Sequence, residues 1–229
     1  ELHKSLPKEQ LEWLRKIDNR WDYLLEYYEN FEYWNPRPEW KNKMVITLPG
    51  NACGHQQRTF ITYWAMRMFL EFGGEPGISM CAGQVRDAFT FANDLYYTDK
   101  HPVYGGVYKP QIHASTDDLP FVGSSTIPFI VSNHGLEHTH DPGKTLREWL
   151  RILKPNGIIA FVIPDEKFEY GPRDPDHKHK YSSEEMKYMY IDPLTEKAEE
   201  PLATGPLCTL HEYDTFQNFF SANCLIQKL

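Results

Sequence analysis

The sequence predicts an α/β fold in which helices cover both faces of a mostly parallel sheet. Two observations predict it. Short apolar runs alternate with stretches of helical periodicity through the middle of the chain. The run at residues 158–163 is apolar on both faces, which is typical of a strand inside a parallel sheet. We expect an N-terminal helical cap at residues 1–43 and the α/β domain at residues 44–229.

The cap is predicted to begin with a long helix. Apolar side chains recur every three or four positions through residues 7–30, and Pro36 and Pro38 end the pattern. Residues 44–48 follow as a short apolar strand that is expected to join the sheet, and residues 59–72 as an aromatic-rich helix.

Further along, apolar runs and turn residues mark the remaining elements. The expected strands lie at residues 78–81, 96–98, 127–132 and 158–163, and the expected helices at residues 85–95, 141–153 and 183–190. A charged insertion at residues 165–206 is longer than ordinary connections, so it is predicted to be a lid or binding loop.

Composition excludes several classes of function. The chain has 229 residues, with 24 Lys and Arg against 32 Asp and Glu, for a formal charge of −8. This balance argues against a nucleic-acid partner or a membrane surface, both of which need clustered positive charge. The four cysteines have no paired spacing, so neither a zinc ribbon nor a disulfide framework is expected, and the predicted location is cytoplasmic.

The most specific pattern runs from Phe129 to Asp165. A strand leads into Ser132-Asn-His-Gly-Leu-Glu-His138, and the helix after it ends in Leu153-Lys-Pro-Asn-Gly157 before the next strand. This order resembles the class I S-adenosylmethionine-dependent methyltransferases, specifically the type 11-like small-molecule group. The resemblance implies a Rossmann-like fold, S-adenosyl-L-methionine as cofactor, and methyl transfer to an O, N or C atom of a small-molecule substrate.

Two details of the pattern concern the backbone and the end of the sheet. Asn156 stands where the family has Gly, and we expect it to keep the positive φ of a tight turn. The family sheet closes with a hairpin. Here a helix-like stretch at residues 215–221 leaves only residues 224–229 for a strand, so the hairpin is expected to be missing, unless the chain is cut short.

The resemblance places the cofactor at the carboxyl ends of the strands. The implied cofactor-binding residues are Ser79, Cys81, Ala82, Gly83, Asp99, Ser115, Thr116, Asp117 and Asn133. Cys81 replaces the first Gly of the family's Gly-x-Gly, and Ser79 and Ser115 replace acidic residues. Asp99 would bind the ribose, with Asp94 as the alternative. Because of the replacements, a non-catalytic methyltransferase-like binding protein or subunit remains the alternative function.

His134 and His138 are the catalytic candidates, because histidine readily takes up a proton near neutral pH. His138 could instead be a buried scaffold residue, and Glu137 could cap a helix. The same residues match the inverted zinc-protease motif H-x-x-E-H, which needs a helix; Gly135 argues against one there. We therefore predict no metal site there, and at Asp176-His-Lys-His179 a solvated charged loop is favoured over metal binding. His177, in the insertion, is a candidate to cover the pocket, as are His179 and Tyr181.

Overall fold

The computed structural model describes part of the chain. The described residues are 61–81 (except 62, 63, 66 and 70), 90–92, 114–167, 177–198 (except 197), 205–216 and 221–229. All belong to the second of two compact units, Cys53–Leu229, the first being Glu1–Ala52. The predicted cap and the predicted strand at residues 44–48 lie outside the described residues.

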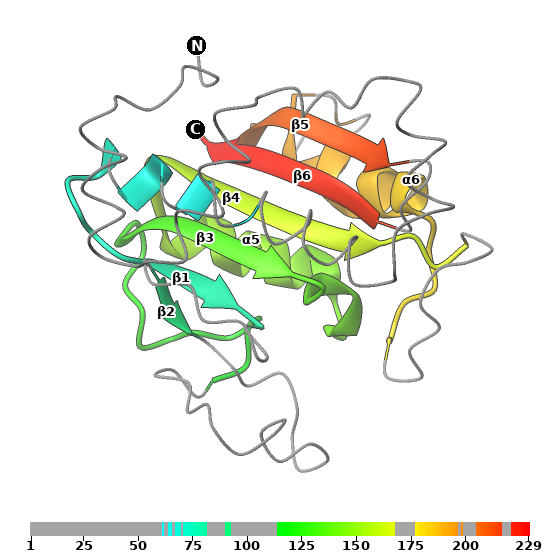
Figure 1. Cartoon of the computed structure of the whole chain (residues 1–229), viewed down its shortest axis with the longest axis horizontal. Helices are drawn as coiled ribbons and strands as arrows, with labels where there is room; N and C mark the ends of the chain where they lie inside the picture. Colours follow the sequence, from blue (N-terminus) through cyan, green and yellow to red (C-terminus); the bar gives the residue numbers. More distant parts are fainter. Residues whose placement is uncertain are drawn as a thin grey trace, which may run out of the picture. The chain divides into compact units, whose positions relative to one another are not determined.

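A six-stranded sheet forms the centre, in the order β2-β1-β3-β4-β6-β5 (Figure 1). Its strands are β1 (Gly77–Met80), β2 (Thr90–Ala92), β3 (Ile127–Asn133), β4 (Leu153–Pro164), β5 (Cys208–Phe216) and β6 (Ser221–Lys228). The first four are parallel, and β6 pairs antiparallel with both β4 and β5. The predicted mostly parallel α/β sheet is confirmed.

Two predictions about strands were wrong. Within the helix expected at residues 85–95, the described residues 90–92 form β2 instead, because Phe91 and its neighbours pair with the buried strand β1. The antiparallel pair β5–β6 is present, and the described residues of the helix-like stretch, 215, 216 and 221, belong to these strands. A register shift between Leu210 and Glu212 interrupts the pairing, and such a bulge hides the two-residue alternation of a strand.

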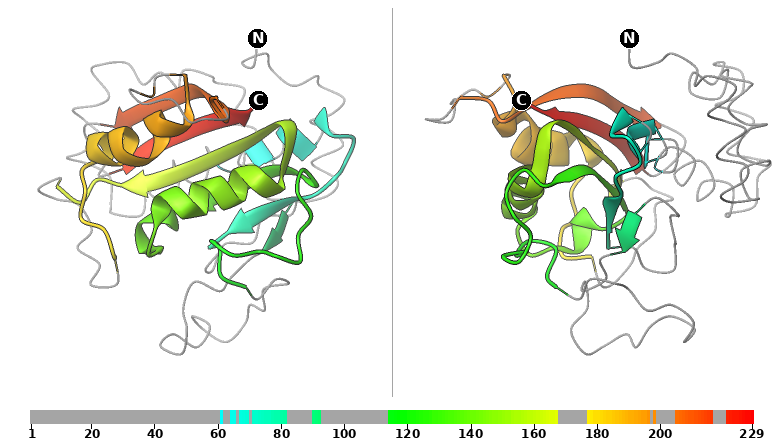
Figure 2. Two further views of the ribbon diagram at one scale, coloured as in Figure 1. Left: turned by 180° about the vertical axis from the view of Figure 1, so that it is seen from behind. Right: turned by 90° about the vertical axis from the view of Figure 1, so that its left-hand side faces the viewer.

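Helix α5 (Pro142–Ile152) covers one face of the sheet, and the helical residues between 61 and 71 lie on the other (Figure 2). Asp141 caps α5 by accepting a hydrogen bond from the Lys144 amide at 2.8 Å. The fully buried Trp149 packs edge-on against Phe161 of β4. Helices are therefore found where residues 59–72 and 141–153 predicted them.

Beyond the sheet, the predicted helix at residues 183–190 is confirmed as three short consecutive turns. They are α6 (Ser183–Met186), the π-helix η3 (Lys187–Ile191) and the 3₁₀ helix η4 (Asp192–Leu194). Ser182 and Glu185 form a capping box at the start of α6. Among the described residues, no helix is both long enough and apolar enough to span a membrane.

Strand β4 is the centre of the core. It is buried continuously from Gly157 to Pro164, as its apolar run predicted. Near the start of β4, Asn156 has the expected left-handed backbone, with φ of +62°. Gly157 follows where a Cβ would lie 2.6 Å from the Pro128 carbonyl oxygen, so β3 and β4 approach each other closely at this point.

Candidate functional site

The carboxyl ends of β1 and β3 come together at the edge where the sequence places the cofactor. Cys81 and His134, the first residues after these strands, both have left-handed φ values, +52° and +53°. Gly135 lies against the β1 end: a Cβ on it would be 2.6 Å from both Cys81 Cβ and Ser132 Oγ. Cys81 thus keeps a backbone conformation that favours glycine, the residue it replaces in the family pattern.

Polar atoms at the end of β3 are buried without a hydrogen bond from any described residue. They are Ser132 Oγ and Asn133 Oδ1. Ser79 on β1 is also buried, and its register places it beside β3. Buried polar atoms are ordinarily satisfied, so these positions are suited to a polar ligand.

Helix α5 holds the loop that contains the adenine-binding candidates. Trp149 Nε1 donates to both the carbonyl oxygen and Oγ1 of Thr116, each at 3.0 Å, so Thr116 anchors the loop to the core. Lys144 Nζ lies 3.1 Å from Asp117 Oδ2, and Ser115 Oγ donates to Asp117 Oδ1. Burial raises the pKa of Asp117, but the hydrogen bonds from Ser115 and Lys144 outweigh it and leave this pKa lowered.

A Glu–Arg pair on α5 holds the continuation of this loop. Glu148 Oε1 accepts the Leu119 amide at 2.8 Å, while Arg151 donates to the carbonyl oxygens of Leu119 and Val122 at 2.9 and 3.0 Å. The hydrogen bond from Arg151 is the main cause of the lowered pKa of Glu148. Sequence reasoning missed this role: the i,i+3 spacing of an acid and a base could have indicated the pair, but not its contacts with the loop.

The two catalytic candidates flank Glu137. Residues 136–138 form a single 3₁₀ turn, η2 (Leu136–His138), so the H-x-x-E-H motif does not lie on an α-helix. His134 Nδ1 and His138 Nε2 lie 3.4 and 3.8 Å from Glu137 Oε1. No side-chain hydrogen bond caps this turn, so the suggested capping role of Glu137 is not observed.

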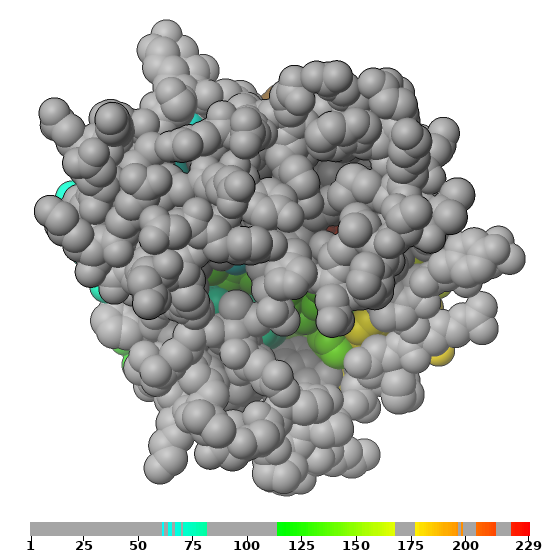
Figure 3. All heavy atoms as spheres, in the orientation of Figure 1, coloured from blue at the N-terminus to red at the C-terminus, as the bar shows by residue number. Residues whose placement is uncertain are grey.

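Part of the long insertion folds back onto η2. The Lys178 amide donates to the Glu137 carbonyl oxygen at 3.0 Å, and His179 Nε2 donates to the Thr139 carbonyl oxygen at 2.8 Å. Residues 177–181, which we call the strap, therefore lie beside η2. In the space-filling view, green and yellow atoms from these parts of the chain meet at the surface (Figure 3).

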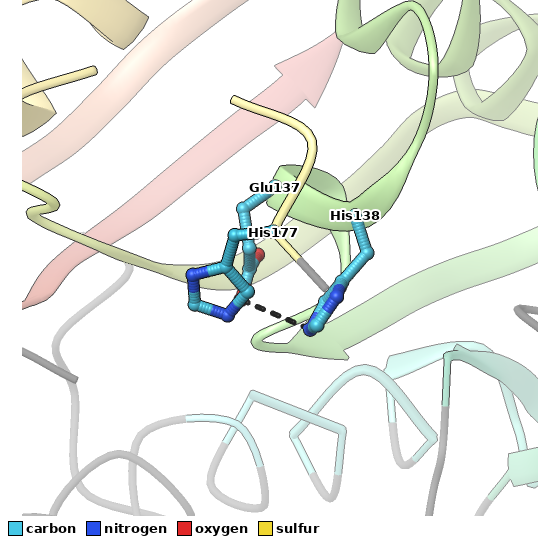
Figure 4. A group of neighbouring side chains, drawn as sticks. All are labelled: Glu137, His138 and His177. Atoms are coloured by element: carbon cyan, nitrogen blue, oxygen red, sulfur yellow. Dashed lines mark ion pairs between the residues drawn. The ribbon is translucent and has the colours of Figure 1, made fainter. Parts of the chain in front are cut away.

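The strap brings His177 to Glu137, a contact that the sequence did not reveal. Its Nε2 lies 3.8 Å from Glu137 Oε1, and its ring packs edge-on against His138 with centroids 4.5 Å apart (Figure 4). The only sequence signal was the place of His177 in the insertion. Ala82, Gly83, Asp94 and Asp99 lie outside the described residues.

Residues 87–161 match a family described as "Methyltransferase domain". This segment of the chain is therefore similar to a methyltransferase domain. The match agrees with the resemblance stated from the sequence and with the Rossmann-like fold, and S-adenosyl-L-methionine is the cofactor that goes with this family. Among curated proteins, none matches the sequence.

Similar solved structures include three methyltransferases. A SAM-dependent methyltransferase from Aquifex aeolicus is 13% identical, with TM-score 0.46, and 80% of this chain and 100% of that chain are covered. One from Methanosarcina mazei is 13% identical, with TM-score 0.45, covering 71% and 97%. The 1,6-didemethyltoxoflavin-N1-methyltransferase of Burkholderia thailandensis, solved with S-adenosylhomocysteine, is 12% identical, with TM-score 0.45, covering 92% and 89%.

The described residues of the methyltransferase domain fit this cofactor. Cys81 has the left-handed backbone of a glycine at the first strand end, and Gly135 leaves room for the chain to turn there. The buried oxygens of Ser132 and Asn133 offer hydrogen-bonding positions next to it. The donor set is therefore compatible with an amino acid head group carrying both charges.

Proposed function

We propose that this protein transfers a methyl group from S-adenosyl-L-methionine to an O, N or C atom of a small organic substrate. The observation that carries the proposal is the junction of Cys81, Ser132 and Gly135 at the carboxyl ends of β1 and β3; β3 and Gly135 lie in the segment 87–161 that matches the methyltransferase family. When bound, the cofactor supplies an electrophilic methyl group on a sulfonium.

The roles assigned to the chain follow the strand ends. Ser79, Cys81, Ala82 and Gly83 would hold the methionine part together with Asn133. In a second group, Ser115 and Asp117 would contact the adenine, and Lys144 keeps Asp117 in place and ionised. Thr116 would support that loop through Trp149 rather than by direct contact.

The ribose carboxylate would come from the segment after β2. This strand ends at Ala92, so Asp94 follows it by two residues and Asp99 by seven. A carboxylate that binds a ribose at the sheet edge belongs next to its strand end. The placement of β2 therefore favours Asp94 over our first choice, Asp99.

His134 would take up the proton that an acceptor O–H or N–H loses on methylation. It follows β3 directly, and its Nδ1 lies 3.4 Å from the Glu137 carboxylate, which stabilises the imidazolium that results. His138 lies deeper and packs on His177, so a supporting role suits it better than proton transfer.

Calorimetric titration of the full chain with S-adenosyl-L-methionine tests the proposal. Binding is expected, and Asp94→Asn is expected to weaken it at least tenfold, while Asp99→Asn and the exposed control Glu184→Gln leave it unchanged. Absence of binding at millimolar cofactor would refute the enzyme proposal and favour the non-catalytic alternative. A positive result is followed by a screen for transfer of a labelled methyl group to pooled metabolites.

A further inference from the structure

A buried cluster of imidazoles and carboxylates lies between η2 and the strap. One ligand atom from each of Glu137, His138 and His177 lies within 4.8 Å of the other two. Figure 4 shows the three side chains pointing toward one another from these two segments. The side chains of Glu137, His177 and His138 are 3%, 4% and 11% exposed, so the cluster is largely buried.

Glu137 is the least satisfied member. Neither oxygen of its carboxylate accepts a hydrogen bond from the described residues, although both are buried. His138 Nε2 and His177 Nε2 each lie 3.8 Å from Oε1. A buried carboxylate is costly unless hydrogen bonds or a cation satisfy it, so this arrangement calls for positive charge at the centre of the cluster.

Glu166 provides the second, independent observation. Its side chain, 5% exposed, hydrogen-bonds to His177 Nδ1. With Nδ1 donating to a carboxylate, the lone pair of His177 is on Nε2, the nitrogen nearest Glu137. A carboxylate behind the far nitrogen of a histidine is the usual support of a metal-binding imidazole, because it sets the tautomer and increases basicity.

We propose that Glu137, His138 and His177 bind a divalent first-row transition cation. Two imidazoles and a carboxylate suit Zn²⁺, Fe²⁺ or Co²⁺ better than Mg²⁺, which prefers oxygen ligands. Ligands at about 2.0–2.2 Å from a tetrahedral ion lie about 3.3–3.6 Å apart. The two histidine nitrogens are each 3.8 Å from Glu137 Oε1 and lie within 4.8 Å of each other, so ion binding would draw the three side chains together.

Three protein ligands leave a coordination position open for a bound molecule. His134 Nδ1, 3.4 Å from the same Glu137 oxygen, places a further imidazole beside that position. The site does not depend on methyl transfer: cation binding is measured without cofactor, so this proposal and the proposed function can each fail separately. The strap, which contributes His177, is what converts two neighbouring residues of η2 into a three-ligand site.

The test is equilibrium dialysis of tag-free, chelator-treated full chain against Zn²⁺, with a parallel visible spectrum of the Co²⁺ form. About one ion per chain is expected. The visible absorption of the Co²⁺ form is expected to be that of an ion with a low coordination number. His177→Ala and Glu137→Gln should each weaken binding at least 100-fold, and Glu166→Gln about 10- to 100-fold through loss of support for His177.

His211→Ala is the matched control, because His211 is exposed on β5, bonds to Gln227, and should leave binding unchanged. Circular dichroism establishes that each variant is folded. If His177→Ala does not fold, the loss of cation binding is tested with Glu137→Gln, which is nearly isosteric with the native side chain. Fewer than about 0.2 ions per chain, or equal affinity in the control and in a folded Glu137→Gln variant, overturns the proposal.

Discussion

Replacing Gly135 with Ala probes the contact between the ends of β1 and β3. The added methyl carbon would lie 2.6 Å from Cys81 Cβ and Ser132 Oγ and 2.9 Å from Cys81 Sγ. Carbon atoms in contact are ordinarily about 3.5–4.0 Å apart, so the strand ends must separate by about 1 Å. Overpacking of this kind costs about 1–3 kcal/mol, and each kcal/mol lowers Tm by about 2–4 °C for a chain of this size.

A urea or thermal unfolding series measures this loss of stability. A double-mutant cycle with Cys81→Gly shows how much of it comes from the contact with Cys81. Cys81→Gly removes two of the three crowded atoms and relaxes the left-handed backbone, so Gly135→Ala should cost at least about 1 kcal/mol less in that background. Gly143→Ala is the control, because the same added carbon would come no closer than 3.3 Å to a neighbour there. A Gly135→Ala cost below about 0.5 kcal/mol, or an equal cost in both backgrounds, would refute the reasoning.

Three further changes test the support for the loop and the turn. Trp149→Phe removes the donor to both oxygens of Thr116 and should cost about 1–3 kcal/mol in urea unfolding; a neutral result would contradict the anchoring role. Asn156→Gly should stabilise the protein by up to about 1 kcal/mol, because glycine adopts φ of +62° without strain; a loss of stability would show that the Asn side chain matters. The pKa of Glu148 is lowered by Arg151, so their pair adds stability above the ordinary value of 4.5 that is lost as the pH falls below it. Glu148→Gln should therefore flatten the acid limb of stability against pH, and an unchanged limb would argue against the pair.

Much of the fold could be predicted because its elements have strong local signals. The apolar run of β4, the capped and amphipathic α5 and the turn at Asn156 are each determined by nearby residues. The strands β2 and β5 were missed for the opposite reason. β2 is only three residues long, and β5 contains a bulge, so their pairing partners decide their conformation.

The candidate site, like the fold, has parts that the sequence predicted and parts that it did not. The order of residues after β3 pointed to the methyltransferase family and to His134 and His138, since this motif is contiguous. Glu148 and Arg151 could not be connected with the loop at residues 119–122 from sequence, because their partners are backbone atoms 29 to 32 positions away. Side-chain to backbone contacts at that separation leave no periodic pattern.

The sequence by itself determined the fold class, the family and the strand that carries the catalytic candidates, because local periodicity and contiguous motifs encode them. Only the tertiary structure decided that the strap at residues 177–181 lies on η2, that His177 reaches Glu137, and that Glu166 supports it. These contacts join residues that are between 11 (177 − 166) and 41 (178 − 137) positions apart in the chain, and the folded backbone brings them together. Contacts between the strap, η2 and Glu166 depend on tertiary packing, so the sequence alone could not predict them.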